Sequence, residues 1–351
     1  MMGQFHTVIK PFGLSAEGEA VSAVVLDNGI ISCEVLSFGA TLRSLTVPDG
    51  TGGRRDIVLG YDTLQEYETN DGYLGATVGR FANRIAKGRF ILNGTTYALA
   101  ANDGENHLHG GVRGFSHRIW TIERVEPNKV TLSLVSEDGD EGYPGNLAVH
   151  VTYALIGSAL AIHYEAVSDA DTICNLTNHS YFNLAGHNSG VVSDQEIMVN
   201  AERYTPNAAD NIPLGALCSV DGTPMDLRNL TPIGAHLNAS FEQLRQARGY
   251  DHNYEIIGNC GKLRHAASAR SKVSGITMQV DTTMPGIQLY TANFLSKRKG
   301  KHNGSYDRNH AFCLETQFYP DSPNQSAFLS PLLKLGETYS HTTMFSFSVA
   351  P

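Results

Sequence analysis

Residues 89–99 read RFILNGTTYAL, and this stretch decides the fold class of the chain. Two short runs rich in β-branched and aromatic side chains, Arg89–Leu92 and Thr95–Leu99, flank the dipeptide Asn93-Gly94. Asn-Gly between such runs is the strongest short-range signal for a β-hairpin, because both residues tolerate the positive φ angles of a two-residue turn. The stretch therefore predicts a strand, a tight turn and a second strand.

The same pattern recurs along nearly the whole chain. Asp27-Asn28-Gly29 separates the run Ala23–Leu26 from the run Ile30–Ser37, and further strand-like runs follow at Val130–Val135, Leu147–Leu155 and Leu160–Ala166. Glycine is abundant, at 35 of 351 residues, which suits a fold with many tight turns. We predict an all-β fold, a large many-stranded antiparallel β-sandwich with few short helices.

Helical signals are confined to two places. We expect Leu64–Glu68 to form one turn after Thr63, and Phe241–Ala247 to form two turns. The second segment has the residues of a capping box and a glycine stop, namely Ser240, Gln243 and Gly249. No repeat has a solenoid or propeller period, and no low-complexity linker divides the chain. We predict a single domain over residues 1–351; the alternative is two packed β halves divided near Asp169–Cys174.

The chain has a formal net charge of −9, from 26 Lys+Arg against 35 Asp+Glu. This balance argues against nucleic acid and against an anionic membrane as partners, because both need a basic surface. The one basic cluster, Lys297-Arg298-Lys299 with Lys301, is flanked by glycines and is interpreted as a solvated loop.

The five cysteines are scattered, with no C-x-x-C pair, which fits reduced thiols rather than a disulfide framework. The start of the sequence, MMGQFHTVIKPFG, lacks an apolar core of signal-peptide length, and no later run approaches a membrane span. We expect a soluble, cytoplasmic protein.

A carboxylate interrupts an apolar run within residues 309–325, NHAFCLETQFYPDSPNQ. Alternation along Ala311–Gln317 places Glu315 on one face with Cys313 and Gln317. A carboxylate there must reach solvent, find hydrogen-bond donors, or sit in a pocket where desolvation raises its pKa, as in a general acid or base. The prolines that follow end the strand, so Glu315 is expected near a strand end and facing a cleft built by loops. The alternative is a surface salt bridge on an edge strand.

Residues 79–90, GRFANRIAKGRF, contain the pair Asn83 and Arg84 beside Arg80 and Lys87. An arginine fork next to an amide suits neutral hydroxyls or a carboxylate partner. The alternative interpretation is a solvated strand face.

Residues 106–111, NHLHGG, contain His107 and His109, which point the same way on a strand, as a pair of zinc ligands does. No HExxH or paired-cysteine element accompanies them, so we expect no metal. The two glycines instead favour a tight turn with one histidine facing a small ligand.

Three other stretches contain polar candidates. In NLTNHSYFNL, His179 shares a face with Thr177 and Tyr181, and an ordinary pKa of about 6.5 suits it to proton donation near neutral pH; the alternative is a hydrogen-bonded core histidine. In GYDHNY, Asp251 is a candidate acceptor for ligand hydroxyls, with an Asx-turn as the alternative. In PGIQLY, an amide and an aromatic ring on one face suit a sugar, from Gln288 and Tyr290.

No G-x-S-x-G, Walker A or G-x-G-x-x-G motif is present, which removes the simplest serine hydrolase, phosphoryl-transfer and dinucleotide interpretations. No cofactor is implied. The remaining groups, one glutamate with histidines, an arginine, an aspartate and amides, point to general acid–base chemistry on a neutral polyol.

The chain resembles the aldose 1-epimerase family, also called galactose mutarotases, in an ordered set of motifs: GRFANRIAKG, NHLHGGVRGF, NLTNHSYFNLAG, GYDHN, PGIQLYTANF and FCLETQFYPDSPNQ. The resemblance runs from about Tyr73 to Gln325. It implies a large β-sandwich that interconverts the α and β anomers of free aldohexoses such as D-galactose and D-glucose, without metal or cofactor.

The resemblance also implies roles for individual residues. Glu315, in the ETQ motif, matches the catalytic base, and His179, in the TNHSYFNL motif, matches the catalytic acid. The positions that match the sugar-binding set are Asn83, Arg84, His109, Asp251 and Gln288. His107 receives no role, and His109 stays a second candidate for the acid.

Three alternative functions remain open from the sequence. A hexose-6-phosphate 1-epimerase needs extra cationic contacts to the phosphate. A non-catalytic carbohydrate-binding module needs no acid–base pair. A sandwich-fold glycosidase needs a second carboxylate opposite the first, for which Asp251 is the candidate. The expected partner is a small-molecule sugar substrate, and the expected assembly is a monomer or a homodimer.

Overall fold

The hairpin predicted from Asn93-Gly94 is present in the computed structural model, which describes residues 6–69 and 71–349. Its strands are β8 (Arg89–Leu92) and β9 (Thr95–Ala98), paired in antiparallel register. Asn93 and Gly94 have φ angles of 50° and 79°, as this type of two-residue turn requires.

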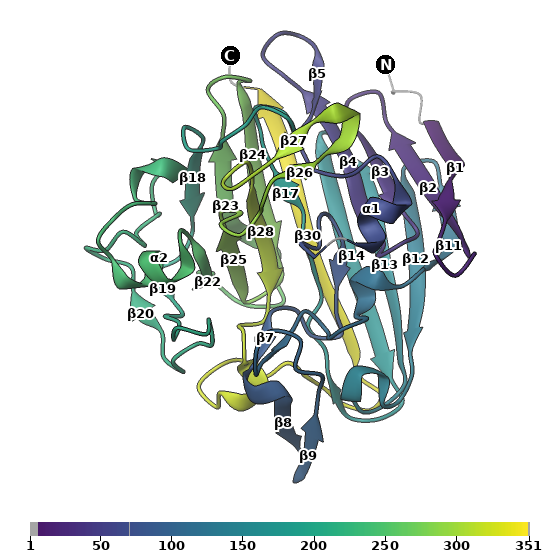
Figure 1. Ribbon diagram of the computed structural model, residues 1–351, viewed down its shortest axis with the longest axis vertical. Coiled ribbons are helices and arrows are strands. Elements are labelled where there is room, and N and C mark those ends of the chain that lie inside the picture. The colour runs from purple at the N-terminus through teal and green to yellow at the C-terminus, as the bar shows by residue number, and fades with distance from the viewer. Residues whose placement is uncertain (1–5, 70, 350–351) are drawn as a thin grey trace.

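One layer of the molecule is a nine-stranded antiparallel sheet, whose long central strands are visible in Figure 1. Four consecutive strands from the first half of the chain lie side by side, and the last strand of the chain pairs with the fourth of them on one side and with a strand from the second half of the chain on the other. The strands in spatial order are β11 (Thr121–Glu126), β12 (Lys129–Ser136), β13 (Leu147–Ile156), β14 (Ala159–Ser168), β30 (Thr338–Val349), β24 (Ile276–Thr282), β23 (Arg264–Arg270), β18 (Glu196–Val199) and β21 (Thr231–Pro232).

Two smaller antiparallel sheets form the opposing layer. The six-stranded sheet has the order β17 (Tyr181–Phe182), β28 (Phe312–Gln317), β25 (Gly286–Tyr290), β22 (Asp251–Glu255), β19 (Arg203–Tyr204) and β20 (Cys218–Ser219). The five-stranded sheet consists of β1 (His6–Leu14), β2 (Ala20–Asp27), β3 (Ser32–Leu36), β4 (Thr41–Pro48) and β5 (Arg54–Asp56). The other two-stranded pairs are β6 (Thr77–Val78) with β16 (Thr177–Asn178), β7 (Arg84–Ile85) with β10 (His107–Leu108), β15 (Thr172–Ile173) with β29 (Leu332–Leu333), and β26 (Arg298–Lys299) with β27 (Ser305–Tyr306).

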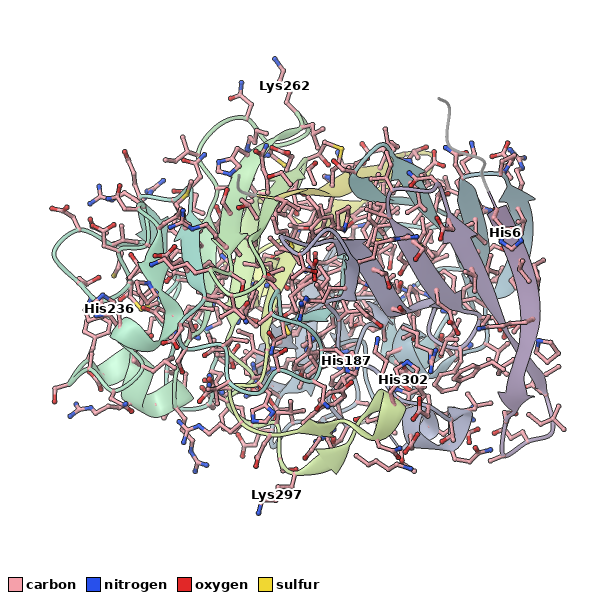
Figure 2. The ribbon with its side chains drawn as sticks, turned by 90° about the horizontal axis from the view of Figure 1, so that it is seen from above. His6, His187, His236, Lys262, Lys297 and His302 are labelled. Atoms are coloured by element: carbon pink, nitrogen blue, oxygen red, sulfur yellow. The ribbon has the colours of Figure 1, made fainter. Side chains whose placement is uncertain are left out.

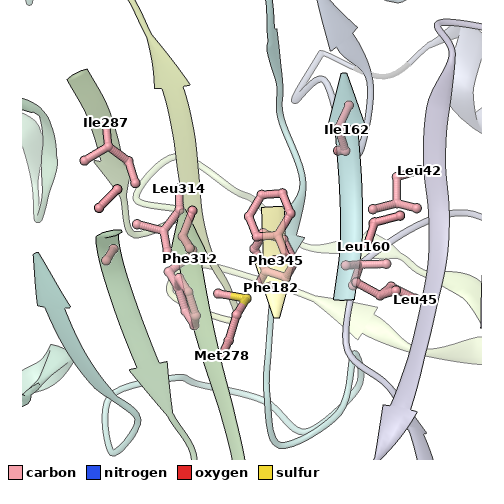
Figure 3. Packing of buried hydrophobic residues seen from close by; sticks show 14 of the residues in the cluster. Leu42, Leu45, Leu160, Ile162, Phe182, Met278, Ile287, Phe312, Leu314 and Phe345 are labelled. Atoms are coloured by element: carbon pink, nitrogen blue, oxygen red, sulfur yellow. The ribbon is translucent and has the colours of Figure 1, made fainter. Parts of the chain in front are cut away.

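The hydrophobic core lies between these layers. One buried cluster joins Ile162 and Phe345 of the nine-stranded sheet to Phe312 and Leu314 of β28 and to Leu42 of β4. Figure 3 shows these side chains meeting between the strands that bear them. The prediction of a many-stranded antiparallel β-sandwich is confirmed, and the core-facing residues of β28 are the alternate ones that the sequence indicates.

Both predicted helices form, but the capping box predicted for the second is found at the first. α1 (Leu64–Glu68) begins after Thr63, and Thr63 and Glu66 exchange the two hydrogen bonds of a capping box. α2 (Glu242–Ala247) has Phe241, not Ser240, at its N-cap, and no side chain caps it.

The predicted capping box of α2 is wrong because Gln243 has a distant partner. Its buried amide accepts from the backbone N–H of Asn207 (2.6 Å) and donates to the carbonyl of the same residue (2.9 Å). The helix ends at Arg248, which has φ 57°, one residue before the predicted glycine. The described residues also contain short 3₁₀ turns at Ala86–Gly88, Phe115–His117, Asp140–Gly142, Ile233–Ala235, Lys301–Asn303 and Ser322–Asn324.

The division near Asp169–Cys174 finds no support in the sheet topology, because the nine-stranded sheet combines strands from both sides of that segment. We infer that the chain forms a single domain, since one buried cluster extends from Val24 to Phe347. Within residues 6–69 and 71–349, no helix has the length and apolar character needed to cross a membrane.

Arg80 differs from the solvated strand face that its sequence neighbourhood allows. It is 1% exposed, and its guanidinium donates to the carbonyl oxygens of Pro144 (2.8 Å), Gly145 (2.9 Å) and Ser136 (2.9 Å). Pro144 and Gly145 lie in a loop and Ser136 is the last residue of β12, so the arginine side chain supplies donors to buried carbonyls where the regular sheet ends. Arg80 is therefore a structural residue.

Replacing Arg80 by Met should lower the free energy of unfolding by about 3 kcal/mol or more, because several buried carbonyls lose their donor at once. Denaturant unfolding measures the change. The matched control is Arg89→Met at an exposed position on β8, expected to stay within about 0.5 kcal/mol of the parent protein. Equal stability of the two variants contradicts the structural role of Arg80.

Candidate active site

A cavity of about 280 Å³ opens on the face of the six-stranded sheet that points away from the core. Four neighbouring strands, β17, β28, β25 and β22, contribute Tyr181, Glu315, Tyr290 and Asp251 to its floor. The walls come from loops and short strand pairs, through Asp71, Gly72, Tyr73, Asn83, Arg84, Asp103, Leu108, His109, His179, Phe294, Leu295 and Arg298.

Glu315 lies in the middle of this floor. β28 is an inner strand of the sheet, between β17 and β25, and Glu315 is directly opposite Gln288 of β25. Its side chain is 2% exposed, and the strand ends two residues later, before the prolines. The predicted placement near a strand end and facing a loop-built cleft is confirmed. The alternative of a surface salt bridge on an edge strand is wrong.

The surroundings of Glu315 favour its protonated form. Burial, and next the charge of Asp251, hold the pKa of this carboxyl well above its ordinary value of 4.5, while Arg84 acts in the opposite direction. Among the described residues, its Oε2 atom accepts no hydrogen bond. A buried carboxyl in this condition has the properties of a group that exchanges protons.

His179 is a close titratable neighbour of Glu315. It lies between β16 and β17, and its Nε2 is 3.6 Å from Oε2 of Glu315. Its ring stacks with Tyr181 (centroids 5.0 Å apart) and with Tyr73 (6.0 Å). Burial lowers the pKa of His179 to about 4. Its Nδ1 has no partner among the described residues, so a fully hydrogen-bonded core histidine, the alternative from the sequence, does not describe it.

His109 is held by the backbone of Asn83. The N–H of Asn83 donates to Nδ1 of His109 (3.1 Å), and both residues have positive φ angles, 65° and 52°. A neutral imidazole that accepts at Nδ1 has its proton at Nε2. Burial, and next His179 and Arg84, lower the pKa of His109 well below 6.5. The ring is therefore a neutral donor.

His107 does not share the orientation of His109. β10 ends at Leu108, and the positive φ of His109 turns the chain out of the strand. His107 instead contacts the carbonyl of Ala100 (2.7 Å) and the hydroxyl of Tyr143 (2.6 Å), outside the cavity. Of the two histidines, only His109 is among the described residues that line the cavity, and that it faces a small ligand stays a prediction.

Within the described part of the chain, three possible metal ligands lie close together in the cavity. One nitrogen each of His109 and His179 and one oxygen of Glu315 lie within 4.8 Å of one another. The hydrogen bond from Asn83 to Nδ1 leaves His109 with a proton, not a lone pair, on Nε2. A metal would have to break that hydrogen bond, so the three residues fit a neutral ligand with hydroxyl groups better than they fit a cation.

Arg84 and Asp251 complete the polar lining. Nε of Arg84 donates to Asp103 (2.7 Å), and the arginine side chain is only 13% exposed, so the solvated strand face is wrong here. Asp251 is a buried strand residue, not an Asx-turn, and its Oδ1 accepts from Gln288 (2.7 Å). Gln288 is not itself part of the lining: Gln317 donates to its carbonyl oxygen (3.4 Å), so the two amides orient Asp251.

A family model described as aldose 1-epimerase matches residues 22–346 of the sequence. The chain belongs to the aldose 1-epimerase family. A galactose mutarotase of Bos taurus is 46% identical over 331 residues, covering 93% of each chain, and an aldose 1-epimerase of Escherichia coli is 35% identical over 338 residues, covering 95% and 97%. The crystal structure of a galactose 1-epimerase from Lactobacillus acidophilus superposes with a TM-score of 0.85 at 28% identity, covering 99% and 100%.

This member of the aldose 1-epimerase family has cavity residues that sequence reasoning did not single out. Tyr73 stacks on His179 and lies 4.6 Å from the ring of His109. Asp103 binds Arg84, and Asp71 lies 2.8 Å from Arg298. They follow no strand or helix period, so no local signal was available to find them.

The interpretation of the basic cluster as a solvated loop is wrong for two of its members. Arg298 lines the cavity, and Lys301 is fully buried, with its Nζ 2.6 Å from Asp56 and 2.8 Å from the carbonyl of Arg43. Lys297 does project outward, as Figure 2 shows.

Proposed function

We propose that the protein is an aldose 1-epimerase, an isomerase that interconverts the α and β anomers of free aldohexoses such as D-galactose and D-glucose. The observation that supports this most directly is the pair of buried proton-exchanging groups, Glu315 and His179, 3.6 Å apart on the floor of a cavity for one small ligand. Two relatives support the proposal, because both are named after this activity: a galactose mutarotase of Bos taurus and an aldose 1-epimerase of Escherichia coli.

The chemistry needs one base and one acid. Glu315 removes the proton of the hydroxyl on C1 while His179 gives a proton to the ring oxygen, which breaks the bond between C1 and that oxygen and yields the open-chain aldehyde. Rotation about C1–C2 presents the other face of the carbonyl. Reclosure then runs the two proton transfers in reverse, so both residues regain their starting state. Each proton transfer contributes roughly 10²–10⁴-fold to the rate.

The burial of the pair determines where its proton resides before sugar binds. A raised pKa for Glu315 and a lowered pKa for His179 mean that the empty site keeps one proton, on the carboxyl group. A sugar hydroxyl that donates to Glu315 stabilises its carboxylate, and a ring oxygen that accepts from His179 favours the imidazolium. Sugar binding therefore moves the shared proton from base to acid, which prepares the pair for ring opening.

The sugar-binding set consists of Asn83, Arg84, His109, Asp251 and Gln288, in two groups. Arg84 and Asp251 line the cavity next to Glu315 and offer a donor fork and an acceptor to sugar hydroxyls. His109, oriented by Asn83, donates through Nε2, so His179 alone is assigned the acid role. Gln288 acts through Asp251 by fixing which carboxylate oxygen stays free.

The charge of the cavity argues against a phosphorylated hexose as substrate. Its lining contains four acidic side chains and two arginines, so with Glu315 protonated and the histidines neutral the formal charge is −1. Both arginines already pair with an acid, Arg84 with Asp103 and Arg298 with Asp71. Among the described lining residues, each cation already has a carboxylate counter-ion, so none has an uncompensated positive charge for a phosphate dianion.

The two remaining alternatives fit the geometry less well. A non-catalytic sugar-binding module gives no reason to bury a carboxyl beside a histidine at unfavourable free energy. A glycosidase needs two carboxyl groups on opposite sides of the scissile bond, whereas Glu315 and Asp251 rise from the same face of one sheet.

The expected setting is the cytoplasm, and all five cysteines are free thiols in the structure. The proposed partner is the small-molecule sugar alone, with no cofactor, no nucleic acid and no membrane, and the proposed assembly is a monomer or a homodimer.

Polarimetry of freshly dissolved α-D-glucose or α-D-galactose should show anomeric equilibration faster than the uncatalysed rate.

Glu315→Gln should lower kcat by about 10²–10⁴-fold and leave sugar affinity within about tenfold, because it removes the base but keeps the shape of the side chain. Glu165→Gln makes the same change at an exposed position on β14 and should leave kcat unaltered. Unchanged turnover in Glu315→Gln refutes its role as base, and no acceleration with either sugar refutes the proposed function.

The pH dependence of kcat/KM should be bell-shaped with a low acid limb. Below about pH 4 His179 takes up a second proton, so the pair has no base and activity falls. As pH rises through the raised pKa of Glu315, above 4.5, the shared proton is lost and activity falls again. Rates are measured by polarimetry after subtraction of the uncatalysed rate at each pH. An acid limb near pH 6.5, the ordinary value for histidine, contradicts this assignment.

D-glucose 6-phosphate should be a poor ligand. Its dianionic phosphate meets a negatively charged cavity, so kcat/KM should be at least about 100-fold lower than for D-glucose, and millimolar concentrations should not inhibit turnover of D-galactose. The control competitor is D-glucose itself at the same concentration and ionic strength. Preferential turnover of the phosphate ester identifies the protein as a hexose-6-phosphate epimerase instead.

A further inference from the structure

Arg298 reaches the cavity from a two-stranded hairpin, whereas the floor residues stand on the six-stranded sheet. β26 and β27 form this hairpin, which lies on the outer side of the six-stranded sheet in both Figure 1 and Figure 2. The side chain of Arg298 is 17% exposed and borders the cavity, although neighbouring Lys297 and Lys299 are exposed. Arginine is rarely buried unless its charge is paired, so its contacts must account for its position here.

The contacts of Arg298 use only part of its donor capacity. Nη1 donates to the hydroxyl of Tyr61 (3.1 Å) and lies 2.8 Å from Asp71, and Nε donates to the carbonyl of Ser296 (3.3 Å). Nη2, in contrast, donates a hydrogen bond to no residue within 6–69 and 71–349. Because a guanidinium has five N–H groups in a fixed fork, two of them remain for a ligand in the cavity.

The hairpin holds this arginine in a fixed position. Lys301, fully buried, joins the hairpin to Asp56 of β5 through its Nζ (2.6 Å), and its backbone N–H donates to the carbonyl of Gly60 (2.9 Å). Residues 59–61 in turn connect to the floor, because the N–H of Leu59 donates to the carbonyl of Tyr181 (2.9 Å). Arg298 is therefore fixed on the Tyr181 side of the cavity.

The two arginines of the cavity act on different ends of it. Arg84 influences the pKa of Glu315 and of Asp251, whereas Arg298 influences that of Tyr181. The order of the strands gives the same arrangement, because Asp251 on β22, Glu315 on β28 and Tyr181 on β17 follow one another across the floor in this direction, and Arg298 lies at the Tyr181 end. In a pyranose the two ring neighbours of C1 are C2 and the ring oxygen, and C5 with its hydroxymethyl group follows the ring oxygen. With C1 at Glu315 and the ring oxygen at His179, C2 faces Asp251 and Arg84, and C6 faces Arg298.

We propose that Arg298 is a specificity-determining residue that donates from Nη2 to the C6 hydroxyl of the aldohexose. This inference rests on the proposed function and names the part of the substrate that Arg298 recognises. Its chemistry distinguishes hexoses with a free 6-hydroxyl from 6-deoxyhexoses and from aldopentoses, which lack that oxygen. A hydrogen bond from a charged donor accounts for about 10- to 100-fold in kcat/KM.

The test compares D-galactose with 6-deoxy-D-galactose, which differ only at the 6-position. For the parent protein, kcat/KM from polarimetry should be about 10- to 100-fold higher for D-galactose. Arg298→Ala should remove most of this preference by lowering the value for D-galactose, and should leave the value for the 6-deoxy sugar within about threefold. Arg124→Ala, at an exposed position on β11 remote from the cavity, is the matched control and should change neither value.

The outcomes separate this inference from the proposed function. If the parent protein accelerates neither sugar, the proposed function fails. If it accelerates both sugars equally, or if Arg298→Ala lowers both values by the same factor, recognition of the 6-hydroxyl by Arg298 is overturned. Arg298→Lys, which keeps the charge but loses the fork, should give an intermediate preference and covers the case in which the alanine variant does not fold. D-glucose against D-xylose repeats the comparison with the whole hydroxymethyl group removed.

Discussion

Glu315 is buried on a strand that is covered on both faces, and the geometry of the site depends on this constraint. Phe312 and Leu314 of β28 pack into the core between the two layers, so alternation sends Glu315 to the opposite face. A shift of the strand by one residue would place the carboxyl in the hydrophobic core and expose the hydrophobic residues to the cavity. The packing of the sandwich thus fixes the position of the proposed base with more precision than a loop would give it.

The same burial gives Glu315 and His179 their chemical properties. Desolvation opposes both the carboxylate and the imidazolium, so the pair keeps one proton in its uncharged arrangement until a ligand supplies hydrogen bonds to the charged one. The groups around them are already oriented: Asn83 fixes the tautomer of His109, and Gln288 fixes Asp251. Little reorganisation therefore remains for the moment at which the ring opens.

Local sequence patterns were sufficient to predict the strands and the alternation of β28, because hairpin turns and side-chain faces are determined by neighbouring residues. The errors arose where a distant partner decides the outcome. Gln243 caps no helix because it binds Asn207, and Lys301 is buried because Asp56, 245 residues away, neutralises it. Nothing in the sequence indicated that Tyr73 belongs to the site, because only the fold brings its ring onto His179. The roles of the site residues came from the resemblance to a family, since the spacing of single polar residues left alternatives open for each.

The distribution of the cavity residues between sheet and loops separates chemistry from recognition. The proposed base and its neighbours Tyr290 and Asp251 stand on strands whose other face is core, so a substitution that moves them also disturbs the packing of the sandwich. Arg298 stands on a two-stranded hairpin that is joined to the sandwich by the buried ion pair of Lys301 and by hydrogen bonds to Gly60. Substitutions in that hairpin change which sugar hydroxyls the walls of the cavity can bind, while the floor keeps its geometry. A sandwich of this kind can therefore vary the sugar that it prefers without rebuilding the pair of groups that opens the ring.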